Sequence, residues 1–122
     1  MTTETFLFDT YALVELMNDN PNYTKYASQD IIVNDFIFCE FCYQLLKAGE
    51  KNSEEYLGEI EESIVYPSPK ILKEAMNFRY KNKTKKMSMT DCISYIMAGN
   101  LGIKFLTGDK EFKGMEGVEF VK

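Results

Sequence analysis

The sequence predicts an α/β protein in which helices cover both faces of a mostly parallel sheet. Short apolar runs, such as "FLF" at 6–8 and "KFLT" at 104–107, are typical of buried strands. The segments between such runs carry apolar residues at helical spacing. Because the 122 residues contain no repeat and no linker, we expect a single domain that spans residues 1–122.

The first expected elements are a strand at 6–8 and a helix from about Thr10 to Asn18. The helix is indicated by apolar side chains at 12, 13, 16 and 17. The run "DNPN" at 19–22 has the composition of a turn, and "DIIV" at 30–33 is expected to form a second short strand.

A long helix is expected from Phe36 to about Ala48, with Asn34 or Asp35 as its N-cap and Gly49 at its end. Nearly every residue between 36 and 46 is apolar or aromatic, so the sequence predicts that this helix is largely buried. Ser53 is expected to cap the next, more exposed helix.

The rest of the chain continues the alternation. Ser68 followed by Pro69 is typical of a helix start, and Gly102 is typical of a helix end. The expected elements here are strands at 64–66, 104–107 and 118–121, a helix beginning near Pro69, and a helix from about Met89 to Asn100.

Composition excludes several kinds of chemistry. The chain has no histidine, which rules out an imidazole base, a Ser-His-Asp relay and histidine-bound metals. Cys39 and Cys42 form a C-x-x-C motif without a second pair, so we interpret the three cysteines as reduced core thiols. No apolar run is long enough for a membrane span and no signal peptide is evident, so we expect a cytoplasmic protein.

The net charge of −5 argues against a general electrostatic attraction for nucleic acid, although a local patch can still bind phosphate. The only dense basic run is "RYKNKTKK" at 79–86. It is either a solvated loop or a surface that holds the backbone of a nucleic-acid substrate. The candidate residues are Arg79, Lys81, Lys83, Lys85 and Lys86.

Four acids stand at informative positions. Asp9 and Asp109 follow strands, and in parallel sheets ligands bind beyond the carboxyl ends of the strands. Glu40 lies in the apolar helix with no Lys or Arg within four residues, so its burial would need a cation or several donors. Taken singly, each acid also has a local explanation: an N-cap at Asp9, a capping box at Asp91, a turn at Asp109 and a solvent-facing position for Glu40.

Together these acids and their surroundings resemble the PIN domain, a small metal-dependent nuclease fold that includes the VapC toxins. The segments "FLFDTYALVELM" and "TDCISYIMAGNLGIKFLTGDKEF" carry the resemblance, with the acid at Glu40 between them. The most specific part is the pattern D-x-x-x-x-x-x-A-x-x-x-G-I-x-x-L-T-x-D-x-x-F, which begins at Asp91 and contains Asp109.

The resemblance implies a three-layer α/β/α fold with a five-stranded parallel sheet and the four acids in one pocket. It implies that Asp9, Glu40, Asp91 and Asp109 hold Mg²⁺ or Mn²⁺, one ion or two, with Thr107 positioning Asp109. These metals suit oxygen ligands and assist the hydrolysis of phosphodiesters. The activity implied is that of an endoribonuclease, and the toxin branch implies a homodimer and a small antitoxin protein.

Two positions depart from the usual family pattern, which often has Asn where this chain has Tyr11 and a hydroxyl where it has Ile37. Neither change removes a carboxylate. Tyr11 could stack on a base or serve packing only. Two alternatives remain open, namely a noncatalytic binding or scaffold module of the same fold and a housekeeping RNA-processing nuclease.

Overall fold

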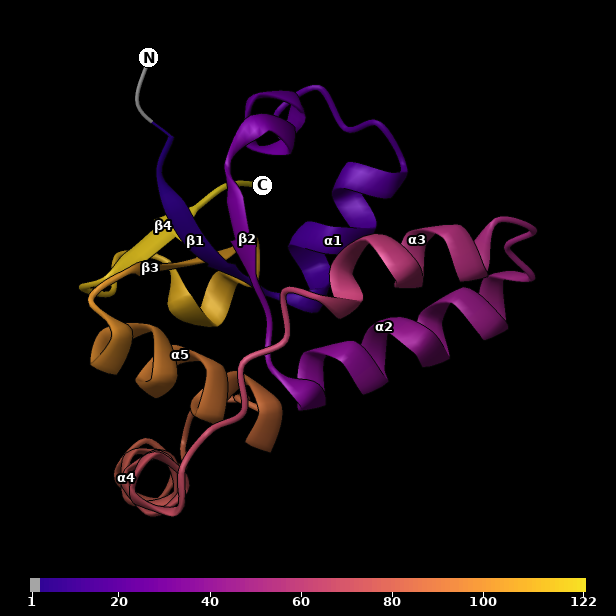
Figure 1. The fold of residues 1–122 in the computed structure, drawn as a ribbon. Coiled ribbons are helices and arrows are strands. Elements are labelled where there is room, and N and C mark those ends of the chain that lie inside the picture. The colour runs from indigo at the N-terminus through magenta and orange to yellow at the C-terminus, as the bar shows by residue number, and fades with distance from the viewer. Residues whose placement is uncertain (1–2) are drawn as a thin grey trace.

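A computed structural model describes residues 3–122. Its sheet has four parallel strands in the order β2-β1-β3-β4 (Figure 1). Hydrogen-bond register aligns Leu7 of β1 with Ile32 of β2 on one side and with Phe105 of β3 on the other. The strands are β1 (Thr5–Phe8), β2 (Asp30–Ile32), β3 (Lys104–Thr107) and β4 (Val118–Phe120).

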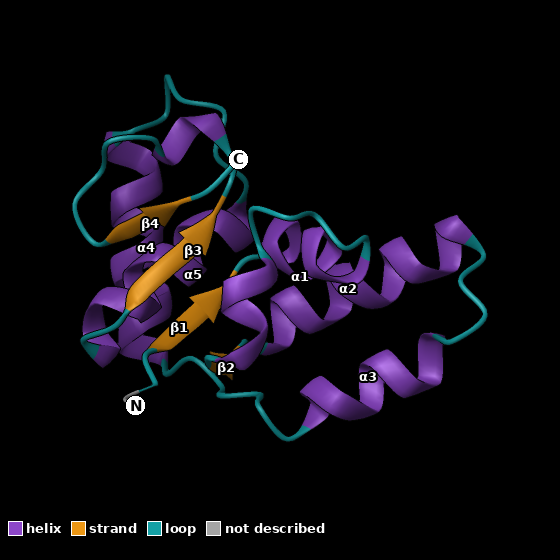
Figure 2. Cartoon of the chain, turned by 90° about the horizontal axis from the view of Figure 1, so that it is seen from above, coloured by secondary structure: helices purple, strands orange, loops and turns teal. Residues whose placement is uncertain are grey.

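Five α-helices and two 3₁₀ helices connect the strands. Helices α4 and α5 pack together on one side of the sheet, whereas α1, α2 and α3 form a second group, from which α2 and α3 extend away from the strands (Figures 1 and 2). The bounds are α1 (Thr10–Met17), α2 (Asp35–Ala48), α3 (Ser53–Glu61), α4 (Pro69–Lys81), α5 (Met89–Leu101), η1 (Thr24–Ser28) and η2 (Lys110–Phe112).

The central strands form the core, because β1 and β3 are covered on both faces. Leu7, Phe8, Phe105 and Leu106 are fully buried, as expected for parallel strands between helices. The predicted caps at Asn34, Gly49, Ser68 and Gly102 are confirmed. No helix among the described residues has the length and apolar character that crossing a bilayer requires.

The expectation of a fifth strand at 64–66 is wrong for the described chain, which has only an isolated parallel bridge between Val33 and Ile64 there. Two hydrogen bonds hold this bridge, from Val33 N to Ser63 O at 3.1 Å and from Val65 N to Val33 O at 2.8 Å. Pro67 has no backbone N–H with which to extend the ladder. The segment therefore ends as a bridge instead of a strand.

Three further expectations need correction. Helix α2 is only half buried, since it packs Ile37, Phe41 and Leu45 inward and leaves Tyr43 and Leu46 exposed. The core-thiol interpretation holds for Cys92 but not for Cys39, which is exposed. Asn52, and not Ser53, precedes α3, and the Ser53 hydroxyl donates to Glu50 O at 2.6 Å because the chain turns back there. Helix η1 was not anticipated; it places Tyr26 in the core, and Tyr23, the residue before it, is buried too.

Candidate metal and catalytic site

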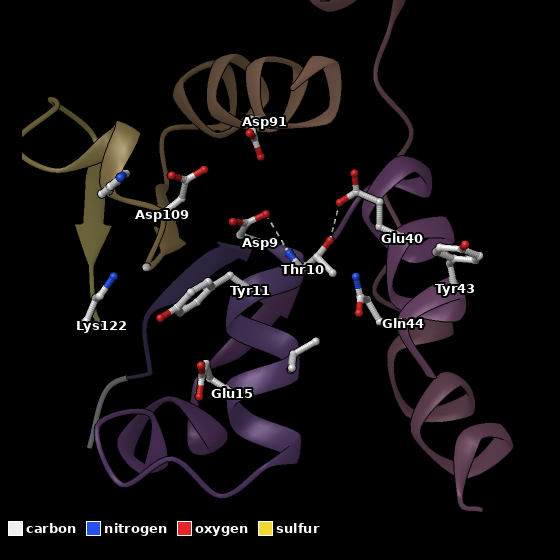
Figure 3. A pocket seen from close by; sticks show the side chains of 13 residues that line it. Asp9, Thr10, Tyr11, Glu15, Glu40, Tyr43, Gln44, Asp91, Asp109 and Lys122 are labelled. Carbon is white, nitrogen blue, oxygen red and sulfur yellow. Dashed lines mark hydrogen bonds between the residues drawn. The ribbon is translucent and has the colours of Figure 1, made fainter. Parts of the chain in front are cut away.

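The four acids predicted from the sequence line a single open pocket of about 730 Å³ (Figure 3). Asp9 directly follows β1, and Asp109 lies two residues beyond the end of β3. Because these strands are parallel neighbours, both acids reach the same edge of the sheet. Glu40 enters the pocket from α2, and Asp91 enters from the first turn of α5.

Three of these acids also cap helices, which confirms the local interpretation of Asp9 as an N-cap and of Asp91 as part of a capping box, whereas Asp109 caps a 3₁₀ helix where a turn was expected. Asp9 accepts from Thr10 N at 2.8 Å at the start of α1, and Asp109 accepts from Glu111 N at 3.0 Å at the start of η2. Asp91 completes a capping box with Ser88. Each cap fixes the orientation of its carboxylate relative to the backbone. Because of where the strands and helices lie, all three carboxylates line the same pocket.

Asp9 is the most buried acid of the pocket, with 5% of its surface exposed. Its Oδ2 accepts from the Thr107 hydroxyl at 2.7 Å. Burial raises the pKa of Asp9 to about 7, and the negative charges of Asp91 and Glu40 add to the rise, while the hydrogen bonds from Thr107 and Thr10 oppose it. Near neutral pH, Asp9 is therefore shared between its charged and neutral forms.

The pKa of Asp91 is raised as well, first by burial and then by the charges of Asp109 and Glu40. The backbone and hydroxyl of Ser88 partly offset this rise. The pKa values of Asp9 and Asp91 are thus both raised in part by the charges of other acids in the pocket. Among residues 3–122, none of the four forms an ion pair, since the ion pair found there joins Lys104 to Glu119 at 3.8 Å. The pocket concentrates negative charge, and within residues 3–122 no Lys or Arg forms an ion pair with the four acids.

Thr107 joins the ends of the two central strands. Its buried hydroxyl donates to Asp9 and accepts from Asp109 N at 3.0 Å. It thereby holds both acids at the carboxyl edge of the sheet. A hydroxyl is needed because the same oxygen must both donate and accept.

Glu40 is held by a contact that the sequence did not reveal. The Thr10 hydroxyl donates to Glu40 Oε1 at 2.8 Å, which links α1 to α2 next to Asp9 (Figure 3). The partner lies thirty residues away along the chain, so an examination of residues near Glu40 could not find it. The one sequence feature that could have suggested this contact is the position of Thr10, a polar residue directly after Asp9 at the end of β1.

Further side chains line the pocket beside the four acids. Tyr11 lies against Gly108, where an added Cβ would come within 2.2 Å of the Tyr11 ring and 2.5 Å of Val121 O. Only a glycine fits at this position, so Tyr11 serves packing at the base of the pocket as well as lining it. The pocket is also lined by Thr10, Val14, Glu15, Tyr43, Gln44, Lys110 and Lys122.

The basic run does not line the acidic pocket. Three of its basic residues, Arg79, Lys83 and Lys85, line a separate hollow at the end of α4. The cations that line the acidic pocket are Lys110 and Lys122. Both lysines lie after β3 in the chain. Each is a single charge in the sequence, so no pattern there predicted that it would line the pocket.

The donor set of the pocket fits a hard divalent cation. All candidate ligands are carboxylate or hydroxyl oxygens, which Mg²⁺ and Mn²⁺ prefer. Within the described chain, one oxygen each of Glu40, Asp91 and Asp109 has no hydrogen bond and could serve as a ligand. Across residues 3–122, however, no three acidic or cysteine side chains converge closely enough to hold an ion as they stand.

A family model described as PIN domain matches residues 6–118. The chain therefore belongs to the PIN domain family, as the sequence predicted. Among curated proteins, no match was found.

Solved structures with the same fold include a toxin-antitoxin complex and a toxin. A toxin-antitoxin complex from Klebsiella pneumoniae matches at 18% identity with a TM-score of 0.77, over 93% of this chain and 95% of that chain. VapC20 of Mycobacterium tuberculosis, a toxin that cleaves the sarcin-ricin loop, matches at 15% identity with a TM-score of 0.77, over 96% and 99%. PAE2754 from Pyrobaculum aerophilum matches at 19% identity with a TM-score of 0.72, over 98% and 90%. At these identities the likeness establishes the fold.

Proposed function

We propose that this chain is a metal-dependent endoribonuclease that hydrolyses phosphodiester bonds of RNA and acts as the toxin of a VapBC-type pair. The observation that carries the proposal is the gathering of Asp9, Glu40, Asp91 and Asp109 in one pocket of a PIN domain. A pure scaffold gains nothing from burying carboxylates beside one another, because burial first and repulsion second raise the pKa values of Asp9 and Asp91 and cost stability.

Asp9, Glu40 and Asp91 would hold Mg²⁺ or Mn²⁺, directly or through water. When bound, such an ion lowers the pKa of a water and neutralises charge on the phosphate. Asp109 holds a second ion or orients the attacking water, and Thr107 fixes the position of Asp109 through its hydrogen bond to the Asp109 N–H. Thr10 fixes Glu40 on the opposite wall of the pocket.

The proposal extends to assembly and location. One solved structure of the same fold is a toxin-antitoxin complex, which supports a small antitoxin protein as a partner. Helix α2 supports contacts with protein, because Tyr43 is 62% exposed and Leu46 is 76% exposed on a face beside the pocket. We propose a homodimer in the cytoplasm, organised as a single domain over residues 1–122.

The decisive experiment measures cleavage of labelled single-stranded RNA by the purified chain with Mg²⁺ or Mn²⁺, and again with a chelator. The Asp9→Asn variant should lower the rate on the order of a hundredfold or more, because the most buried ligand of the pocket loses its charge. Asp30→Asn, at an exposed acid on β2 outside the pocket, is the matched control and should keep the parental rate.

Equal cleavage by the parent and Asp9→Asn, or cleavage that persists in chelator, would contradict the assignment. A parent that cleaves no RNA would favour the noncatalytic module. A reading frame for a small DNA-binding antitoxin beside this one supports the toxin role, and without it a housekeeping nuclease becomes the better proposal.

A further inference from the structure

A second hollow, of about 340 Å³, lies at the end of α4 and along the loop that leads to α5. We call it the α4 groove. Its lining consists of four cationic or aromatic side chains and two methionines, and no carboxylate contributes to it. The lining residues are Met76, Arg79, Tyr80, Lys83, Lys85 and Met87.

The α4 groove is a local exception in an acidic protein. The net charge is −5, yet five of the fourteen Lys and Arg residues fall within the eight positions 79–86, where no acid occurs. All five are exposed, and within residues 3–122 none of them forms an ion pair. Their charge is therefore available to a polyanion outside the chain.

Tyr80 gives the groove a second property. Its ring is 71% exposed, and Lys83 Nζ lies 4.5 Å from the ring centroid. A bare aromatic ring held among cations suits a ligand with flat bases and regularly spaced phosphates, since the ring stacks on a base while the cations hold the backbone. The carboxylates of an acidic polypeptide would pair with the cations, but such a polypeptide has no flat base to stack on the Tyr80 ring.

Two segments connect the α4 groove to the acidic pocket. Lys85 Nζ donates to Glu111 O at 3.3 Å, and Glu111 follows Lys110, which lines the acidic pocket. Met87 lines the groove and is followed by Ser88, the cap of the helix that presents Asp91. The groove is thus linked to the elements that carry Asp91 and Asp109, through the segment that leads into α5 and through η2.

We propose that the α4 groove binds single-stranded RNA beside the cleavage site, with Arg79 and Lys83 on phosphates and Tyr80 stacked on a base. This assignment rests on the proposed function for the identity of the ligand. It narrows the basic run to the side chains that line the groove, and it explains how a chain of net charge −5 can hold a polyanion next to a pocket of carboxylates.

The test measures binding of a fluorescent single-stranded RNA by anisotropy, with the full chain in chelator so that no RNA is cut. The Arg79→Gln/Lys83→Gln double variant should weaken binding about tenfold and reduce the slope of log K against log salt by roughly 1.4, the effect of losing two phosphate contacts. Tyr80→Ala should weaken binding at least about fivefold, whereas Tyr80→Phe should retain it. All these positions are on the surface, so melting temperatures should stay close to that of the parent.

The matched control is Lys70→Gln/Lys73→Gln, which removes the same charge from exposed positions at the other end of α4. Equal weakening by both double variants would mean that only net charge matters and would overturn the proposal. Binding of polyglutamate in place of RNA, unaffected by Tyr80→Ala, would assign the groove to an acidic polypeptide and also overturn it. A chain that binds RNA through the groove but never cleaves it with metal would contradict the nuclease and leave the groove assignment standing.

Discussion

Asp9 combines burial with a cluster of like charges. Its surroundings supply two hydrogen bonds, from Thr107 and Thr10, and these stabilise the charged form. Burial and the charges of Asp91 and Glu40 act in the opposite direction and prevail, so the pKa of Asp9 rises to about 7. The conflict makes Asp9 a sensitive reporter of the pocket, because anything that adds positive charge there favours the ionised form.

This pKa gives a prediction for stability without metal. Between pH 4 and pH 7 Asp9 loses its proton in the unfolded chain but keeps it in the folded chain, so its contribution to stability falls as pH rises through this window. Asp9→Asn removes that dependence. Relative to the parent, the variant should gain free energy of unfolding up to about 4 kcal/mol by pH 7, with little gain at pH 4. Denaturant titrations of both proteins at several pH values would measure it, and parallel pH profiles would refute the raised pKa.

Helix α5 depends on its first turn for both stability and the site. Ser88 Oγ accepts from Asp91 N at 3.0 Å, and Asp91 Oδ2 accepts from Ser88 N at 2.9 Å. The same carboxylate that closes this capping box also faces the pocket (Figure 3). The cap therefore aims a candidate ligand as well as starting a helix.

Ser88→Ala should cost about 1 kcal/mol of stability, the usual cost of a lost N-cap. It should also lower the cleavage rate, because the Asp91 N–H loses its hydrogen bond to Ser88 Oγ and the first turn that presents the Asp91 carboxylate is held less firmly. Ser68→Ala is the matched control, since Ser68 caps α4 through Ile71 N at 3.3 Å and lies outside the pocket. It should cost similar stability and leave the rate at saturating RNA unchanged. Equal rates for the two variants would show that the cap does not aim Asp91.

The starts and ends of helices could be predicted from the sequence where a single residue determines them. The caps at Asn34 and Ser88 and the stops at Gly49 and Gly102 depend on local backbone chemistry, so they were predictable. The convergence of Asp9 and Asp109 was also predictable, because adjacent parallel strands end at one edge.

The predictions that were wrong, and the features that were missed, depend on contacts between residues far apart in the sequence. The burial of α2 was overestimated because composition does not say which apolar face finds a partner, and Tyr43 and Leu46 find none within the described residues. The strand expected at 64–66 does not form, because Pro67 has no N–H to continue the pairing and, of the residues described, only Val33 pairs with this segment. The link from Thr10 to Glu40 and the place of the basic run beside a second hollow follow from tertiary packing.

For the whole molecule, the excess of carboxylates predicts that a divalent cation stabilises the fold by mass action. Mg²⁺ or Mn²⁺ at a hundred times its dissociation constant should add about 2.7 kcal/mol, a rise of several degrees in melting temperature, and excess chelator should reverse it. Asp9→Asn should lose most of this rise, and sodium chloride at equal ionic strength should not reproduce it. The same rise in parent and variant would place the cation elsewhere.

The pairing of β1 with β3 has a consequence for biosynthesis. The hydrogen bond between Thr107 and Asp9 spans 98 positions of the chain, and Asp109 is translated after the other three acids. A nascent polypeptide that ends before β3 carries three of the four acids and can pair β1 with β2, but it lacks β3, Thr107 and Asp109, so the acidic pocket stays incomplete. We expect such a ribosome-bound precursor to be harmless to RNA, and stop codons just before β3 to yield inert products.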